Sequence, residues 1–245
     1  MRILLAKLAL SFGALVIIAL TAGSARADGI VFAGQDDCFP AGVGRGCGDA
    51  RAPHVLSLQS NGQNPTSTGS VGVKPNGSGD VRTGDWLRGS NTQTVSATQI
   101  GLTNASQLRI FFDINEPNSA NRGTVTLNSL VLTAYNSSGQ AVFTASLLSA
   151  PLTLHEVGNG QGHSDYAFML DAAAAARLQA ALTADPNLRF GLMASVTGVE
   201  GGPESFFIGT APAAVPEPAT MFLLGTGLVG VAASLRRRRK AAPKG

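Results

Sequence analysis

The sequence predicts a mainly β protein: an antiparallel, β-sandwich-like ectodomain with one short Ala-rich helix. Three observations lead to this class. Short apolar runs recur from Val95 onward, and turns rich in Gly and Asn separate them. Five consecutive alanines, Ala172–Ala176, mark a single helix. About eight short strands joined by such turns are typical of an antiparallel sandwich. The two ends of the 245-residue chain differ in composition from this domain, and we expect them to be targeting segments.

The first segment, residues 1–27, has the pattern of a signal peptide. Two basic residues, Arg2 and Lys7, precede an apolar core of thirteen residues, Leu8–Leu20. Ala25 and Ala27 are the small residues that signal peptidase requires, so Asp28 is the predicted mature N-terminus. An uncleaved anchor is the alternative, although such a core is short for a membrane span of roughly 20 residues.

The next segment, residues 28–94, is rich in Gly, Ser and Asn and is weakly patterned. Its apolar runs are Gly29–Ala33 and His54–Leu58. Asn61–Asp80 has the composition of a loop or linker. Composition leaves open whether this stretch is mobile or packs as irregular β structure.

Cys38 and Cys47 lie in this segment and are the two cysteines of the chain. An even cysteine count in an exported chain favours a disulfide, and the glycines between them allow the short loop to close. Such a bridge would stabilise the fold by about 2–3 kcal/mol in the chain-entropy model. Metal ligation is the alternative, but two cysteines without a nearby histidine make a poor zinc site.

Residues 95–211 contain the predicted sandwich. Every second residue from Leu108 to Ile114 is apolar, which places these side chains on one face. A three-residue step at Asn128-Ser129 predicts a bulge or two short strands. Asn136–Gly139 is a turn signal and predicts a hairpin. The hairpin strands and the remaining expected strands are Leu130–Tyr135, Ala141–Leu147, Leu152–Val157, Tyr166–Leu170, Leu188–Val196 and Ser205–Ile208.

The helix is predicted over Ala172–Leu182. Asp171 has the side chain of an N-cap, and Asp185-Pro186 ends the helical pattern. A helix of this length needs packing to be stable, so we expect Leu178 and Leu182 to cover a sheet edge or one end of the sandwich.

Net charge excludes a nucleic-acid partner. The whole chain is +3, but 1–27 holds three basic residues and no acid, and 218–245 holds six basic residues and no acid. The part between them has nine basic and fifteen acidic residues, a net charge of −6. A mildly acidic domain without a basic stripe lacks the electrostatic footprint of nucleic-acid binding.

The end of the chain combines three features without a gap. Pro216, Glu217 and Pro218 form a Pro-Glu-Pro motif, and the uncharged stretch 219–235 follows at once. Seventeen helical residues span roughly 25 Å, slightly less than a hydrocarbon core of about 30 Å. A transmembrane helix is therefore predicted here, and the basic residues after it should stay cytoplasmic and leave the preceding chain outside. This basic stop comprises Arg236, Arg237, Arg238, Arg239 and Lys240.

This order of features over residues 215–240 resembles the PEP-CTERM sorting signal of exported proteins from Gram-negative bacteria. The resemblance implies recognition and processing by exosortase, a membrane-embedded cysteine transpeptidase-like enzyme. It also implies an inner-membrane intermediate with its N-terminus outside, followed by release or transfer to the cell surface or extracellular matrix. The alternative is an ordinary C-terminal anchor that is never processed.

Catalytic motifs are absent from the sequence: it contains no G-x-S-x-G, H-E-x-x-H or P-loop pattern. His54, His155 and His163 are scattered, and we expect surface or hydrogen-bonding roles for them. Calcium is the one candidate cofactor, because oxygen-bearing side chains follow a predicted strand. Its candidate ligands are Asp113, Asn115 and Glu116, with Asn118 and Asn121 nearby. Asx-rich turns are the alternative, since Asn and Asp often cap turns.

Three function classes remain. The leading one is an exported surface or matrix protein with a structural or adhesive role and no enzymatic activity. The resemblance links this role to exopolysaccharide and biofilm, because the sorting family co-occurs with exopolysaccharide production. A carbohydrate-binding module is the second class and an extracellular hydrolase the third. Glycan sites usually present aromatic platforms, whereas the exported part has Trp86, Tyr135 and Tyr166 as its only tryptophan and tyrosines. Signal peptidase and exosortase are the expected partners, and exopolysaccharide is a candidate third.

Overall fold

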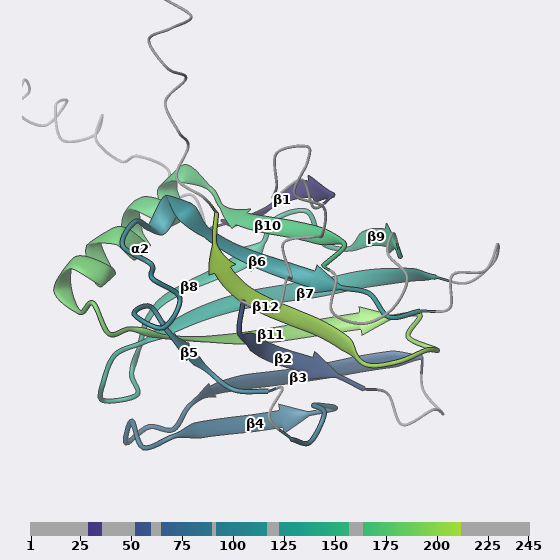
Figure 1. Ribbon diagram of the computed structural model, residues 1–245, viewed down its shortest axis with the longest axis horizontal. Helices are drawn as coiled ribbons and strands as arrows, with labels where there is room; N and C mark the ends of the chain where they lie inside the picture. The colour runs from purple at the N-terminus through teal and green to yellow at the C-terminus, as the bar shows by residue number, and fades with distance from the viewer. Residues whose placement is uncertain are drawn as a thin grey trace, which may run out of the picture. The chain divides into compact units, whose positions relative to one another are not determined.

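The structure, a computed structural model, describes residues 29–35, 52–59, 65–89, 92–116, 123–156 and 164–211 (Figure 1). The chain divides into two units, Met1–Ala211 and Pro212–Gly245, and every described residue belongs to the first. Its strands are β1 Gly29–Gln35, β2 His54–Leu58, β3 Thr66–Val73, β4 Asp80–Gly84, β5 Val95–Ser96, β6 Leu108–Asp113, β7 Thr124–Tyr135, β8 Ala141–Leu147, β9 Leu152–His155, β10 Tyr166–Leu170, β11 Arg189–Thr197 and β12 Glu204–Thr210.

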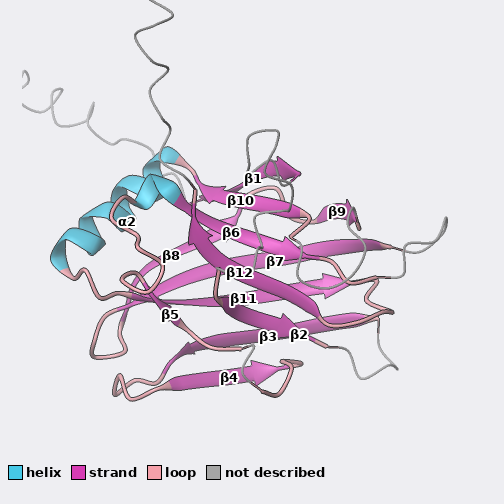
Figure 2. Ribbon diagram, in the orientation of Figure 1, coloured by secondary structure: helices cyan, strands magenta, loops and turns pink. Residues whose placement is uncertain are grey.

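These twelve strands form a single mixed sheet that curls strongly into a half-barrel (Figure 2). Ten of them follow the order β2-β12-β6-β10-β1-β8-β7-β11-β3-β4, while β5 attaches to β11 and β9 to β7. All of these strand pairs are antiparallel except β1 and β8, which run parallel. The mainly β class is therefore confirmed.

The predicted arrangement as an antiparallel sandwich is wrong, because one strand joins what would be its two sheets. β1 pairs antiparallel with β10 on one side and parallel with β8 on the other. The parallel contact is short: Gly29 lies opposite Ser146 and Ile30 opposite Leu147. The N–H of Leu148 extends it by donating to the Ile30 carbonyl at 3.0 Å. We call β1 the seam strand, since this pairing makes the strands one continuous sheet.

The core lies on the concave side of the curl. The alternation predicted for Leu108–Ile114 is confirmed: Leu108, Ile110, Phe112 and Ile114 are all buried. The ring of Phe112 stacks on Phe206 of the neighbouring strand β12, with 4.4 Å between the ring centroids. A fully buried phenylalanine stabilises a fold by about 1.5–3 kcal/mol relative to an exposed one, so such pairs hold adjacent strands together as well as filling the interior.

The predicted bulge and hairpin are both confirmed. β7 is one strand of twelve residues, and its register against β11 shifts between Leu127 and Ser129, so Asn128 has no opposite residue in the β11 register. β7 and β8 pair antiparallel around the turn at Asn136–Gly139. Asn136 stabilises this turn locally, since its Oδ1 accepts the N–H of Ser138 at 3.0 Å.

The predicted helix is also confirmed as α2, Ala172–Ala184, and a 3₁₀ turn, η1 Ala105–Gln107, packs against it. Asp171 is its N-cap and accepts the N–H of Ala174 at 2.8 Å. Leu178 and Leu182 are buried, as expected from the sequence. The helix contacts β8, β1 and β10 on one side of the sheet (Figure 2), so it helps to cover the region around the seam strand.

The interpretation of Asn61–Asp80 as a loop is wrong for residues 66–73, which form the inner strand β3. This strand lies between β11 and β4 and pairs with β11 along six residues, from Thr66 to Val71. Composition missed it because Gly, Ser and Thr dominate the segment. Strand preference depends on the neighbours that a residue meets in the sheet, and one of the two neighbours of β3, strand β11, lies more than a hundred positions away.

The free edge of β2 is covered by the segment that follows β4. Leu87 donates its N–H to Ser57 at 2.8 Å, and Gln59 donates to Asp85 at 2.9 Å. An isolated bridge between Leu58 and Trp86 lies between these two bonds. The two ends of the strand order are thereby connected, and an edge that would otherwise present unpaired backbone groups is protected.

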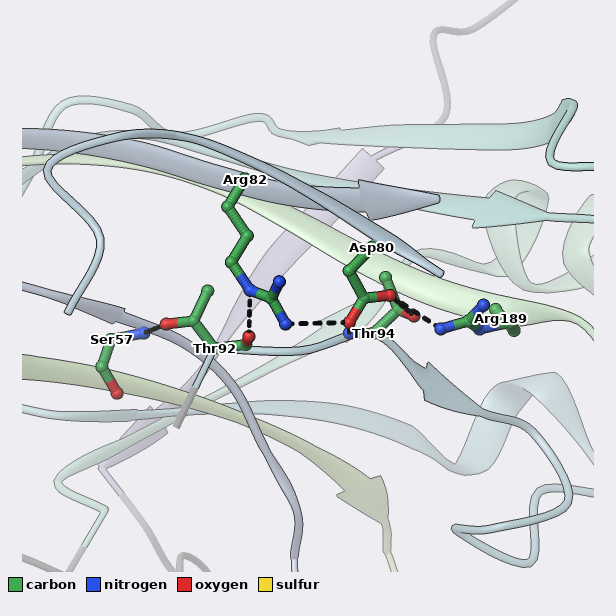
Figure 3. Close-up of polar contacts among 6 residues, drawn as sticks. All are labelled: Ser57, Asp80, Arg82, Thr92, Thr94 and Arg189. Carbon is green, nitrogen blue, oxygen red and sulfur yellow. Dashed lines mark hydrogen bonds and ion pairs between the residues drawn. The ribbon is translucent and has the colours of Figure 1, made fainter. Parts of the chain in front are cut away.

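A polar cluster around Asp80 fastens this connection (Figure 3). Asp80 accepts hydrogen bonds from Arg82 at 3.2 Å and Arg189 at 2.7 Å, and from the Thr94 hydroxyl at 2.7 Å. Arg82 also donates to the Thr92 carbonyl at 2.6 Å, and Thr92 accepts the N–H of Ser57 in β2. We call these residues the Asp80 clamp. It ties β4, β11 and the covering segment to β2.

We predict that Asp80→Ala destabilises the domain by about 2–4 kcal/mol. Each hydrogen bond to a charged group contributes about 1.5–3 kcal/mol to stability. The side chains of Arg82 and Arg189 are 29% exposed, so in the variant water replaces part of the hydrogen bonding that they lose. Urea unfolding measures the change, and Val81→Ala on the exposed side of the same strand is the matched control. A midpoint for Asp80→Ala equal to that of the control would contradict the clamp.

Candidate functional site

Most residues of the predicted export and sorting machinery lie outside the described part of the chain. They are the signal-peptide positions Ala25, Ala27 and Asp28, the cysteines Cys38 and Cys47, the motif Pro216–Pro218, the span 219–235 and the basic stop 236–240. The signal-peptide cleavage and the disulfide therefore stay predictions from the sequence. Within the ranges that the structure describes, none of the helices has the length and apolar character needed to cross a membrane.

The described candidate site is the acidic stretch at the end of β6. The chain leaves β6 at Asp113 and continues through Asn115 and Glu116, which the sequence singled out. Two further buried carboxyl groups come from distant segments: Asp165 before β10 and Glu204 at the start of β12. Asp113, Glu116, Asp165 and Glu204 each have no more than 4% of their surface exposed. The fold thus gathers four buried acids at one end of neighbouring strands.

Glu116 and Glu204, which we call the acid pair, join two loops through backbone hydrogen bonds. Glu116 Oε1 accepts the N–H groups of Glu200 at 2.8 Å and Gly201 at 2.9 Å. Glu204 Oε2 accepts the N–H of Asn115 at 3.0 Å. Each glutamate therefore binds the backbone of the segment that carries the other. The pair connects the chain after β6 to the β11–β12 connection.

The carboxyl groups of the acid pair also meet each other. Glu204 Oε1 is buried and receives no N–H or hydroxyl hydrogen bond, and the Glu204 carboxyl is hydrogen bonded to Glu116. Two carboxylates can form such a bond only when one carries a proton. Burial, together with the negative charges of Glu116 and Asp113, raises the pKa of Glu204 to about 9, while the Asn115 N–H partly opposes this.

The predicted calcium ligands are used differently in this arrangement. Asn115 contributes its backbone N–H and carbonyl to the loop connection, because its carbonyl accepts the N–H of Gly202 at 2.8 Å. One oxygen of Glu116 is occupied by two backbone amides. In the described ranges there is no group of three or more His, Cys, Asp or Glu side chains placed to share a metal ion. Asn118 and Asn121 lie outside those ranges, so calcium stays a prediction.

The described histidines have structural contacts. His54 packs against Phe207 with 4.1 Å between the ring centroids, and burial lowers the pKa of His54. The Nδ1 atom of His155 and the Thr124 hydroxyl are 2.9 Å apart and share a hydrogen bond. Tyr166 donates its hydroxyl to the His155 carbonyl at 2.7 Å. His163 lies outside the described residues.

Sequence reasoning missed Asp165 and Glu204 as partners of the acidic stretch. Glu204 lies 88 positions after Glu116, so spacing gives no sign of their contact. One signal was available: Glu204 begins the apolar run Glu204–Ile208 directly after Gly201, Gly202 and Pro203. An acid at the head of a buried strand needs partners for its carboxyl group, and this requirement marks Glu204 as a structural position.

The sorting signal lies outside the described residues, and it is found in the comparison with known protein families. The family model for the PEP-CTERM protein-sorting motif matches residues 214–239. The chain carries a PEP-CTERM protein-sorting motif. The comparisons with curated proteins and with solved structures find no match.

The matched range includes the Pro-Glu-Pro motif, the apolar stretch and most of the basic stop, so the resemblance seen in the sequence is confirmed. The PEP-CTERM motif implies an exported protein that exosortase processes and that is sorted to the cell surface.

We predict that Glu204→Gln stabilises the domain above about pH 5. Below the ordinary glutamate pKa of 4.5, the folded and unfolded states both hold the proton. Between pH 4.5 and about 9 the folded state keeps it while the unfolded state has lost it, so stability falls with rising pH by about 1.4 kcal/mol per unit. Glutamine supplies a permanent donor to Glu116 and an acceptor for Asn115.

Urea unfolding at pH 4, 6 and 8 measures this difference. The gain for Glu204→Gln should be near zero at pH 4 and reach about 3 kcal/mol at pH 7. Glu200→Gln, an exposed position in the same connection, is the matched control and should keep the wild-type pH dependence. An unchanged pH dependence in Glu204→Gln would show that the acid pair does not share a proton.

Proposed function

We propose that the exported domain has a structural or adhesive role at the cell surface or in the extracellular matrix, without enzymatic activity. The role that we propose is linked to exopolysaccharide and to biofilm formation. In this proposal exosortase cleaves at or close to Pro216-Glu217-Pro218, and the domain is released from the inner membrane or transferred to the surface. A PEP-CTERM motif at residues 214–239 is the observation that carries the proposal.

The use of the buried acids supports a structural role. Three of the four buried acids, Glu116, Asp165 and Glu204, each accept a hydrogen bond from the domain's own backbone, and so do the partly buried Asp80 and Asp171. Carboxyl groups of a hydrolase must instead face a substrate. A domain whose buried acids connect strands and loops is suited to staying folded outside the cell. An extracellular hydrolase is the competing proposal, and released sugar or peptide products would favour it.

The sorting step depends on Glu217 in this proposal. Pro216 and Pro218 have fixed φ angles and bias their preceding residues toward extended backbone. The motif is then presented as an extended peptide, and Glu217 is its only charged side chain. A complementary basic group in exosortase would form a charge-assisted hydrogen bond with it. The apolar span holds the motif at the outer face of the inner membrane, and residues 236–240 prevent further translocation.

We predict that Glu217→Ala blocks sorting but not export. Loss of a charge-assisted hydrogen bond of about 1.5–3 kcal/mol implies about a tenfold or greater fall in processing. Full-length protein should accumulate in the inner membrane, measured by fractionation, immunoblotting and intact mass. Glu200→Ala, outside the motif, is the matched control and should be sorted normally. Wild-type surface protein that retains Ala219–Gly245 would contradict processing at this motif.

The structural or adhesive role has a separate test. Deleting the gene for this protein in its host should lower the attachment of cells to a surface or the cohesion of their matrix. The biomass retained under flow measures both. Wild type should restore it, and Glu217→Ala should not. Normal attachment without the protein would contradict this role, even if sorting through the motif is correct.

A further inference from the structure

The convex side of the sheet is buried at β12 but exposed at β8. In β8, Val142, Thr144 and Ser146 are exposed and alternate with buried residues. In β12, residues 204–209 are all buried, so this strand is covered on both of its sides. The solvent-facing side of an antiparallel sheet stays exposed unless another layer packs on it. The core provides the layer on the concave side of β12, and a second layer must lie on its convex side.

Three apolar residues lie directly opposite one another on this convex side. Phe111 of β6 is opposite Phe207 of β12 and Ala167 of β10. Their neighbours along the strands, such as Phe112 and Phe206, belong to the core, so these three side chains face away from it. Each of the three has no more than 6% of its surface exposed, and together they form an apolar cluster separate from the core. We call them the outer row.

A polar row lies beside the outer row and is equally buried. Ser205 of β12 is opposite Asp113 of β6 and Ser57 of β2, and the two serine hydroxyls are 3.1 Å apart. None of these three residues is more than 8% exposed. Among the described residues, Ala52 packs against the outer row from outside the strands, and one methyl group is too small to bury residues of several strands. Helix α2 does not do so, because its buried side chains belong to the core.

The connection from β1 to β2 must cross this part of the sheet. Their order is β2-β12-β6-β10-β1, and each neighbouring pair is antiparallel, so β1 and β2 run in the same direction (Figure 1). Two strands of one sheet that run in the same direction are joined by a crossover on one of its faces. Packed side chains of these same strands fill the concave face. The convex face, which carries the outer row, is therefore the face open to the crossover.

The length and the end point of this connection fit the buried area. It consists of residues 36–51, sixteen residues that lie outside the described ranges. Four strand spacings separate β1 from β2, which is roughly 19 Å, whereas sixteen extended residues reach about 50 Å. The connection therefore has enough chain to pack on the face that it crosses. It ends at the outer row, because Ala52 packs against that row and the Pro53 carbonyl accepts the N–H of Ile208 at 3.3 Å.

We propose that residues 36–51 are the second layer and dock on the outer row, with Phe39 as their main apolar contact. Phe39 is the one aromatic residue of this segment, and aromatic rings pack favourably against the rings of Phe111 and Phe207. The predicted bridge between Cys38 and Cys47 would hold the segment as a closed loop and lower the entropy lost when it docks. This docking does not depend on the proposed adhesive role.

Trypsin cleavage of exported protein, purified from its host without reductant, tests this docking. Arg45 lies inside the segment, and trypsin cuts there only when the segment detaches from the sheet. In Phe39→Ala the apolar contact is lost while both cysteines remain, so cleavage after Arg45 should be at least about tenfold faster than in wild type. Phe32→Ala, at an exposed phenylalanine of β1, is the matched control and should keep the wild-type rate. Cleavage after Arg189, in the inner strand β11, detects global unfolding and should not change.

A double-mutant cycle with milder changes keeps the test decisive if Phe39→Ala does not fold. Phe39→Leu and Phe111→Leu should each lower the urea midpoint of unfolding. The double variant should lose less than the sum of the two shifts, because both changes weaken the same contact. Phe39→Leu combined with Val142→Ala, at an exposed position on β8, is the control pair, and its two shifts should add.

Three results would overturn the proposal. The first is equal cleavage after Arg45 in wild type and in Phe39→Ala. The second is additivity of Phe39→Leu and Phe111→Leu, which would show that another part of the chain packs on the outer row. The third is a wild-type dimer that Phe111→Leu dissociates, which would assign the outer row to a second copy of the protein.

Discussion

The fold depends on the double pairing of the seam strand β1. In the strand order, four strands, from β2 to β10, lie on one side of this seam strand, and five, from β8 to β4, lie on the other. The strand order passes from β1 to β8 through the pairing of Gly29 and Ile30. Ile30 is fully buried at this junction. A contact of two residue pairs therefore continues the sheet from one half of the strand order to the other.

The curl in turn determines where polar groups must be placed. A sheet that bends around its core brings distant strand ends together, and their unpaired backbone groups need partners. At β2 and β4 these partners are provided by the segment after β4 and by the Asp80 clamp. At the end of β6 they are provided by Asp165 and the acid pair. Carboxyl groups are effective here because one oxygen can accept two N–H groups, as Glu116 does.

The domain and the tail contribute to function in different ways. The PEP-CTERM motif directs the protein to exosortase and the cell surface. It is a short stretch that can be recognised from the sequence. The domain contributes a protected strand edge and buried acids that are bonded to its own backbone. These features are compatible with the structural or adhesive role that we propose.

The sequence by itself determined the local elements and the destination. Apolar alternation placed β6, the Asn136–Gly139 turn placed the β7–β8 hairpin, and Asp171 placed the start of α2, because each depends on neighbours within a few positions. The sorting motif was equally local. Only the tertiary structure decided that β3 is an inner strand, that β1 joins the two halves and that Glu204 meets Glu116. These outcomes depend on contacts between segments about 90 to 130 positions apart, where register and burial are set by the packed sheet and leave no periodic signal in the chain.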